Sequence, residues 1–157
     1  MNGLGNNFHM STVIEIASNN NIVTINTDSG KTAYDVADLM NRNRVGSVIV
    51  IDKKKQPLGI ITERDMVKRV CFKNVSSSRI KVEDIMSSPL ITIMSYDSID
   101  TASRIMTRNK IKRLVVLEPD NSIVGVLSVS DITKHLAKIL LNDYDRYRSL
   151  RFALNLS

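Results

Sequence analysis

Two copies of a seven-residue phrase carry residue types that can bind a ligand. Residues 59–65 read GIITERD and residues 125–131 read GVLSVSD, so each phrase has a hydroxyl residue three positions before an aspartate. That spacing is typical of a helix start, where the hydroxyl accepts from free backbone N–H groups. It also suits a ribonucleotide, because a carboxylate can accept a hydrogen bond from each of the two ribose hydroxyls, and a helix N-terminus attracts phosphate. The phrases therefore allow helix capping alone or nucleotide binding.

Residues beside the phrase would complete a nucleotide site. Arg64 directly precedes Asp65, and its guanidinium can pair with phosphate through two parallel hydrogen bonds. Ile60 and Val126 lie on the strand expected before each helix, where an aliphatic side chain can contact a flat base. Each phrase thus supplies a hydroxyl, a carboxylate and an apolar wall.

The repetition extends well beyond the phrase. At an offset of 66 residues, the stretch from Val36 to Val70 aligns without a gap with the stretch from Ala102 to Leu136. The apolar positions match almost throughout, as in VIVI (48–51) against LVVL (114–117). An internal repeat of this kind indicates two copies of one structural unit.

The pattern of apolar residues predicts the elements that position the two phrases. Short strands are expected at 22–25 and 90–93, followed by an amphipathic helix from Ala33 to Met40 and its counterpart from Ile99 to Met106. Buried strands are expected at 47–51 and 113–117, each paired with a second strand at 58–61 or 124–127. A further helix begins after Thr62 and after Ser128. The order in each unit is β-α-β-β-α.

A single unit of this size cannot bury all of its apolar faces, so two copies should share a core. The predicted fold class is α+β, with two repeats packed sheet to sheet about a pseudo-two-fold axis. The expected divisions are an N-terminal extension (1–12), repeat 1 (13–71), a linker (72–80), repeat 2 (81–141) and a C-terminal helical tail (142–157).

These units resemble a tandem pair of CBS (cystathionine beta-synthase) domains, also called a Bateman module. The resemblance rests on the doubled β-α-β-β-α order, on the Gly-h-h-[Ser/Thr]-x-x-Asp phrase that closes each unit, and on KVEDIMSSPLITI (81–93), and it covers residues from about Val13 to Leu140. It implies a regulatory module without enzymatic activity. Such a module binds AMP, ADP, ATP or S-adenosylmethionine in clefts between the units, uses no catalytic cofactor and forms a flat homodimer.

The resemblance also implies which residues contact the ligand. One site would combine Ile60, Thr62, Arg64 and Asp65 with Thr92, Ile111, Lys112 and Arg113, and the other would combine Val126, Ser128, Ser130 and Asp131 with Thr24, Val45, Gly46 and Ser47. Three cations (Arg64, Lys112 and Arg113) fall on the Asp65 site, whereas the Asp131 site is nearly neutral. The hypothesis is that the Asp65 site binds the more highly phosphorylated ligand, or binds more tightly.

Composition limits the alternatives. A net charge of +6 allows a nucleic-acid partner, although the basic residues are scattered. No spacing of His and Cys suggests a metal site, no apolar run approaches the length of a membrane span, and no signal peptide is evident, so a cytoplasmic location is expected. The single cysteine, Cys71, is expected to pack at a helix end. The rival interpretations are a nucleic-acid-binding protein and a structural dimer with vestigial pockets.

The last residues carry a further apolar pattern. Ile132, Leu136, Ile139 and Leu140 form one helical face, and Tyr144, Tyr147, Leu150, Phe152 and Leu154 follow among Arg146, Arg148 and Arg151. A helix with this face either covers its own domain or forms a contact with a second copy or a partner protein. Because no effector domain is evident in the sequence, the regulated partner is expected to be a separate protein or subunit.

Overall fold

The computed structural model describes residues 11–17, 22–27 and 30–153, with side chains as far as Ser149. Repeat 1 contains β1 (Thr24–Asn26), α2 (Ala33–Asn43), β2 (Ser47–Ile51), β3 (Pro57–Thr62) and α3 (Glu63–Arg69). Repeat 2 contains β4 (Thr92–Met94), α4 (Ile99–Asn109), β5 (Arg113–Leu117), β6 (Ile123–Ser128) and α5 (Val129–Ala153). The predicted β-α-β-β-α order is confirmed in both repeats.

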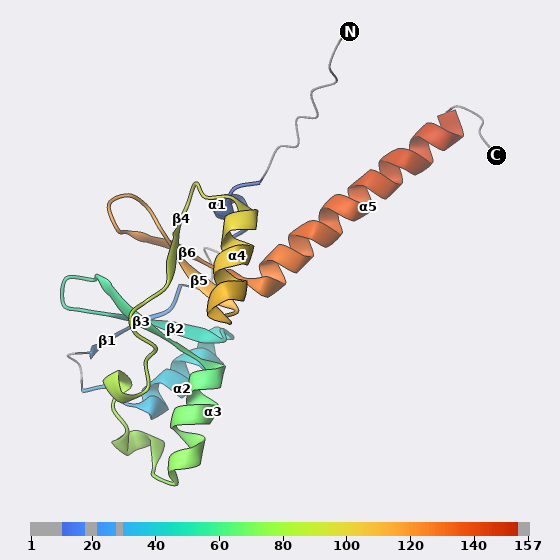
Figure 1. Ribbon diagram of the computed structural model, residues 1–157. Helices are drawn as coiled ribbons and strands as arrows, with labels where there is room; N and C mark the ends of the chain where they lie inside the picture. Colours follow the sequence, from blue (N-terminus) through green and yellow to red (C-terminus); the bar gives the residue numbers. More distant parts are fainter. Residues whose placement is uncertain (1–10, 18–21, 28–29, 154–157) are drawn as a thin grey trace.

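Each repeat forms its own three-stranded sheet, ordered β1-β2-β3 or β4-β5-β6. The first pair in each sheet is parallel and the second is an antiparallel hairpin with a register shift near its turn. The two sheets lie in the middle of the molecule, with α2 and α3 on one outer side and α1 (Val13–Ile16) and α4 on the other (Figure 1). This confirms the predicted packing of one sheet against the other.

Three apolar layers hold these elements together. A cluster that includes Val36, Val48 and Ile61 joins the outer face of the first sheet to its helices. A corresponding cluster in repeat 2 includes Leu114 and Leu127. The third cluster lies between the sheets: its buried members are Ile49, Val115, Leu117 and Val126, and Ile60 packs against it. Both faces of each sheet are therefore covered, which explains why the central strands are continuous apolar runs.

Capping boxes start two of the helices, and the one at α3 was predicted from the sequence. The Thr62–Asp65 pair forms a capping box at α3, and Thr32 and Asp35 form another at α2. The backbone N–H of Thr32, which donates to the Asp35 carboxylate, lowers the pKa of that carboxyl below its ordinary value. Both α2 and α4 end at a residue in the left-handed region, Arg44 (φ 53) and Lys110 (φ 54).

The opening segments of the two repeats cross over. Val13 of α1 is fully buried in the core of repeat 2, and its N–H donates to the Asp97 carbonyl at 2.8 Å. In return, Ile80 and Val82 are buried in the core of repeat 1, where the Ala33 N–H donates to the Ile80 carbonyl at 2.8 Å. Each sequence repeat therefore completes the core of the other. The units that pack in space are not the contiguous stretches that repeat in the sequence.

The connection between the repeats contains two short 3-10 helices, η3 (Cys71–Lys73) and η4 (Ser77–Arg79), and a third, η5 (Val82–Asp84), opens repeat 2. The expectation that Cys71 packs at a helix end is wrong, because its side chain is exposed beyond the last turn of α3.

Candidate functional site

Four polar side chains mark one end of the layer between the sheets. Ser47 on β2 lies opposite Thr62 on β3, and Arg113 on β5 lies opposite Ser128 on β6. Residues opposite each other in an antiparallel pair point to the same face. Two positions further along, the pairs Ile49–Ile60 and Val115–Val126 contribute to the inter-sheet cluster. Ser47, Thr62, Arg113 and Ser128, called here the polar layer, therefore face the other repeat where α3 and α5 begin.

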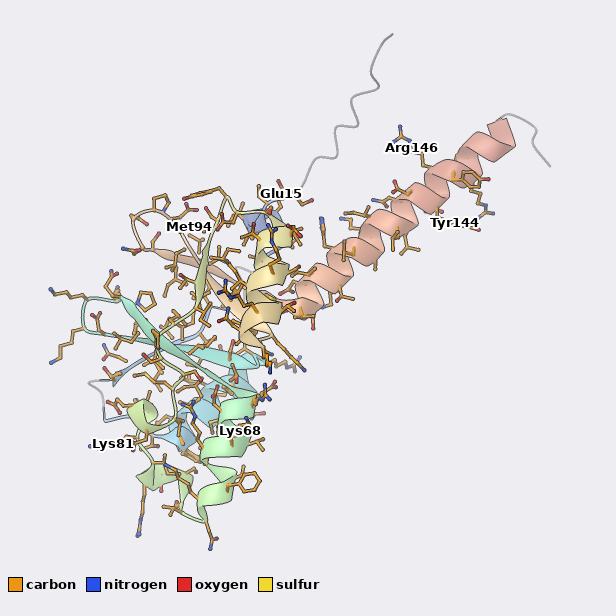
Figure 2. The ribbon with its side chains drawn as sticks, in the orientation of Figure 1. Glu15, Lys68, Lys81, Met94, Tyr144 and Arg146 are labelled. Carbon is orange, nitrogen blue, oxygen red and sulfur yellow. The ribbon has the colours of Figure 1, made fainter. Side chains whose placement is uncertain are left out.

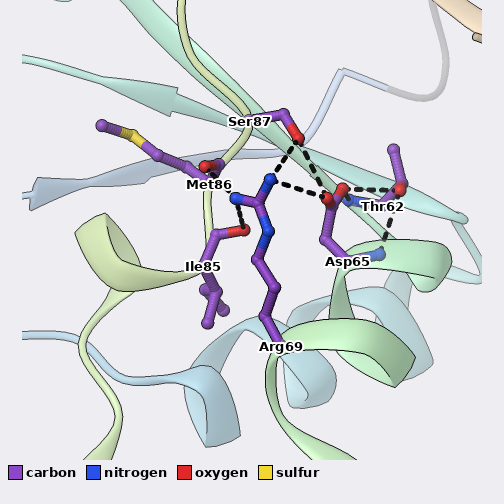
Figure 3. Close-up of polar contacts among 6 residues, drawn as sticks. All are labelled: Thr62, Asp65, Arg69, Ile85, Met86 and Ser87. Atoms are coloured by element: carbon purple, nitrogen blue, oxygen red, sulfur yellow. Dashed lines mark hydrogen bonds and ion pairs between the residues drawn. The ribbon is translucent and has the colours of Figure 1, made fainter.

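The Asp65 carboxylate has protein partners on both of its oxygens (Figure 3). The backbone N–H and the hydroxyl of Thr62 donate to Asp65 Oδ2 at 2.8 and 2.6 Å. The Ser87 hydroxyl donates to Asp65 Oδ1 at 2.9 Å, and the Arg69 guanidinium lies 3.8 Å from the same oxygen. Asp65 is buried. Its carboxylate therefore caps α3 with one oxygen and binds a Ser–Arg pair with the other.

Arg69 extends this network to the start of repeat 2. Its guanidinium donates to the Ile85 carbonyl at 3.0 Å, to the Met86 carbonyl and to the Ser87 hydroxyl at 3.3 Å. The Ser87 backbone in turn pairs with that of Ile60 on β3, with N–H to carbonyl distances of 2.8 and 3.1 Å. A ribose at Asp65 would have to displace Ser87 and Arg69.

Gly59 shows how closely this segment approaches β3. A Cβ atom at residue 59 would lie 2.8 Å from the Ser87 carbonyl oxygen. The glycine of the first phrase is therefore needed for backbone contact with the start of repeat 2.

The Asp131 carboxylate repeats the cap and lacks the second set of contacts. The Ser128 backbone N–H and hydroxyl donate to Asp131 Oδ2 at 2.8 and 2.6 Å. Within the described part of the chain, no hydrogen bond or ion pair reaches Asp131 Oδ1. The position that corresponds to Arg69 is His135, whose Nε2 lies 3.0 Å from the Ser11 hydroxyl instead. One oxygen of the Asp131 carboxylate therefore has no partner among the described residues.

Arg113 links the two repeats within the polar layer. Its guanidinium is 3.6 Å from the Glu63 carboxylate, and the side chains of Arg113 and Glu63 are 27% and 70% exposed. A Cβ atom at Gly46 would lie 2.1 Å from Arg113 Nη2, so the glycine leaves room for the guanidinium. The sequence assigned Arg113 to the Asp65 site and Gly46 to the Asp131 site, whereas the structure places Arg113 beside Gly46 and beside Glu63, which was assigned to neither site.

An open pocket of about 470 Å³ adjoins this contact. It lies between α2 and α3, and its lining consists of Ala37, Met40, Asn41, Arg44, Val45, Gly46, Glu63 and Met66. It shares Gly46 and Glu63 with the surroundings of Arg113.

The other predicted site residues differ in their exposure to solvent. Arg64 and Lys112, which were expected to join Arg113 beside Asp65, are exposed and make no ion pair with the described residues. The Lys112 carbonyl accepts from the Val129 N–H at 3.1 Å. Of the remaining candidates, Thr24 and Ser130 are exposed, Thr92 and Ile111 are half-buried, and Val45 and Ser47 are buried.

Three residues of this region were not predicted as site residues. Arg69 had a local signal, because an aspartate and an arginine four residues apart face each other on a helix. Glu63 also lies inside the first phrase, although nothing in the sequence pairs it with Arg113. Ser87 had no such signal, since its contact with Asp65 depends on how the chain returns after the linker.

The described residues contain no cluster of His, Cys, Asp and Glu side chains suited to a metal ion. Among the helices that the structure describes, none combines the length and apolarity that a bilayer crossing requires.

Comparison with known proteins places these observations in a family. The family model described as CBS domain matches residues 13–71 and 82–138. An uncharacterized protein of Methanopyrus kandleri is 32% identical over 102 residues, which cover 65% of this chain and 52% of that protein. The chain spans about half the length of the first curated relatives it matches.

Solved structures share the fold. A CBS domain protein of Pyrobaculum aerophilum complexed with AMP is 26% identical, with a TM-score of 0.68 over 77% of this chain and 89% of that one. A hexameric CBS-CP12 protein from bloom-forming cyanobacteria is 27% identical, with a TM-score of 0.71 over 78% of this chain and 69% of that one.

Proposed function

Because the chain belongs to the CBS domain family and carries two of its repeats, we propose that it is a non-enzymatic regulatory module that binds an adenosine compound between the repeats. The observation that carries this proposal is the second oxygen of Asp131, which has no partner among the described residues and lies beside the polar layer. The AMP complex of the Pyrobaculum aerophilum relative supports the choice of ligand class.

The proposed site uses groups of both repeats. The Asp131 carboxylate accepts from the ribose hydroxyls, and Arg113 provides the cation for phosphate. Val126 and Ile60, which adjoin the polar layer in the inter-sheet cluster, provide apolar contact for the base. AMP and ADP fit one arginine better than ATP does, because further phosphates would need further cations.

The two phrases are not equivalent in this proposal. The Asp131 site binds the ligand more tightly, whereas the count of cations in the sequence favoured the Asp65 site. Asp65 is already bound on both oxygens, so a ribose there would have to break contacts to Ser87 and Arg69. Asp131 has no such competitor. We therefore expect one ligand per chain, held by Asp131.

Calorimetric titration of the full chain with adenosine, AMP, ADP, ATP and S-adenosylmethionine tests both statements. We expect at least one of these compounds to bind with a stoichiometry of one. At a ligand concentration of a hundred times its Kd, the free energy of unfolding should rise by about 2.7 kcal/mol. A stoichiometry of two would contradict the single site. No binding at millimolar concentrations of any of the five would contradict the ligand class, and salt-dependent binding of duplex DNA instead would favour the nucleic-acid interpretation.

Glu63 provides a way to separate phosphate binding from nucleoside binding. Its carboxylate lies where it competes with a phosphate for the Arg113 guanidinium. Glu63→Gln should therefore tighten AMP binding by at most about fivefold, in line with the ~0.2–1 kcal/mol of an exposed ion pair. The affinity for adenosine should stay the same, because adenosine has no phosphate. Equal changes for AMP and adenosine would show that Arg113 does not bind the phosphate.

The bound state has to reach a partner, and the proposed route is a homodimer or a separate effector protein. A ligand can signal only by binding one conformation or assembly more tightly than another. The hexameric cyanobacterial relative shows that assembly occurs in proteins of this fold.

A further inference from the structure

Helix α5 extends far from the body of the molecule (Figure 1). Its first turns are anchored, because Ile132 is buried in the core of repeat 2 and His135 contacts Ser11. Further along, Leu140 and Tyr144 are 69% and 63% exposed. The first alternative, that this helix covers its own domain, therefore holds only for its start. An isolated helical segment of this length is marginal in water, so the apolar side chains of the extension need a partner.

The exposed side chains form a seam with the spacing of a helix pair. Ala137, Leu140, Tyr144 and Tyr147 follow one another at intervals of three, four and three residues, which is the heptad spacing of coiled coils. His135, which faces the body, lies about 140° around the helix from Leu140 at about 100° per residue. The Tyr144 side chain leaves the helix on the side opposite Arg146 (Figure 2). The seam therefore lies on a different side of the helix from His135 and from Arg146.

We propose that the seam pairs with α5 of a second copy of this chain, in parallel and in register. The flanking residues favour this partner. In a parallel coiled coil, a residue that directly precedes the first seam residue of a heptad flanks the interface. It lies beside the partner helix's residue five positions further along the chain. That rule places Asp143 beside Arg148 of the other copy, and Leu136 beside Leu141. The first pair joins an acidic and a basic side chain, and the second joins two apolar side chains. Each pair forms twice because the dimer is two-fold symmetric.

The charges beside the seam are unused within one chain. Asp143 and Arg148 are exposed, and neither forms an ion pair with any residue that the structure describes. Leu136 and Leu141 are 50% and 64% exposed. This inference takes the homodimer from the proposed function and assigns its surface to α5, independently of the ligand.

Solution mass of the full chain tests the surface. Leu140→Lys should convert a wild-type dimer to a monomer in light scattering, since it places a charge in the seam. Asn142→Lys adds the same charge on the opposite side of the same helix and should leave the dimer intact. Both residues are exposed, so neither change should unfold the monomer. A Leu140→Lys protein that stays dimeric would overturn the α5 contact while leaving the homodimer itself standing.

Charge exchange tests the choice of partner and the pairing of flanking residues. Asp143→Arg alone should weaken the dimer several-fold, because it sets two cations side by side at each junction. Adding Arg148→Asp in the same chain should restore the wild-type dissociation constant. Failure of the second change to rescue the first would overturn the parallel register.

Single-cysteine variants test the orientation. Cys71 is the only cysteine, so Cys71→Ser provides a background for Ala137→Cys and, separately, Tyr144→Cys. In a parallel pair, each new cysteine faces its own copy, and a short bismaleimide should cross-link both variants. An antiparallel pair permits self-cross-linking only near its centre, so a cross-link at one position alone would overturn the parallel arrangement. A wild-type monomer would overturn both this contact and the homodimer, whereas the AMP titration would still test the ligand.

Discussion

Asp65→Ala should lower the free energy of unfolding by about 2–3 kcal/mol, because it removes a buried acceptor that three half-buried residues share. The Thr62 N–H, the Ser87 hydroxyl and the Arg69 guanidinium all lose their carboxylate. The measurement is urea denaturation at neutral pH, with a change in midpoint and an unchanged slope.

Asp131→Ala is the matched control for this change. It removes the same cap contacts, from the backbone and hydroxyl of Ser128, and no other polar contact to a described residue. The expected loss is about 1 kcal/mol, the usual effect of removing a helix cap. Equal losses for the two variants would show that the contacts of Asp65 to Ser87 and Arg69 contribute nothing to stability.

A double-mutant cycle isolates the added contact. Ser87→Ala removes one donor to Asp65, and combining it with Asp65→Ala should cost less than the sum of the two single changes. A coupling energy near zero would assign the excess loss in Asp65→Ala to the Arg69 contact or to the cap.

Asp131→Asn should weaken AMP binding by about tenfold or more. An asparagine oxygen can still accept from the Ser128 N–H and preserve the cap. Its amide nitrogen replaces the free carboxylate oxygen, and a nitrogen donor cannot accept a hydrogen bond from ribose. Hydrogen bonds to a charged group contribute about 1.5–3 kcal/mol, and 1.4 kcal/mol corresponds to a factor of ten.

Two comparisons make the ribose contact specific. The wild-type protein should prefer AMP to 2′-deoxy-AMP, and Asp131→Asn should remove most of that preference. Asp120→Asn, in the exposed turn between β5 and β6 of the same repeat, should change neither affinity. Unaltered AMP binding by Asp131→Asn, with the fold intact, would move the ribose away from the second phrase.

The two phrases show how far local sequence reasoning reaches. The spacing of Thr62 and Asp65, and of Ser128 and Asp131, predicted a helix start with a hydroxyl and a carboxylate at its first turn, and the structure confirms both capping arrangements. Whether each carboxylate can accept a hydrogen bond from a ligand depends on whether another residue already binds its second oxygen. Ser87, 22 residues after Asp65, occupies that oxygen in repeat 1, and the described residues offer nothing comparable in repeat 2.

The number of cations near a motif in the sequence did not predict which cations the fold brings together. The family resemblance predicted that Arg64, Lys112 and Arg113 share one site. In the structure Arg113 meets Glu63 and Gly46 of the other repeat, whereas Arg64 and Lys112 are exposed and form no ion pair with the described residues. The direction of a side chain at a strand end depends on the sheet opposite it, which no local pattern describes.

The sequence by itself determined the duplication, the order of strands and helices in each unit, the helix caps and the apolar character of the central strands. These features depend on residues within a few positions of one another, or on the period of a single element. Only the tertiary structure decided that Val13 completes the second core and Val82 the first, that Asp65 is bound by Ser87 and Arg69, and that α5 leaves the body with its seam uncovered. Those outcomes depend on contacts between segments far apart in the chain, whose free energy no single segment contains.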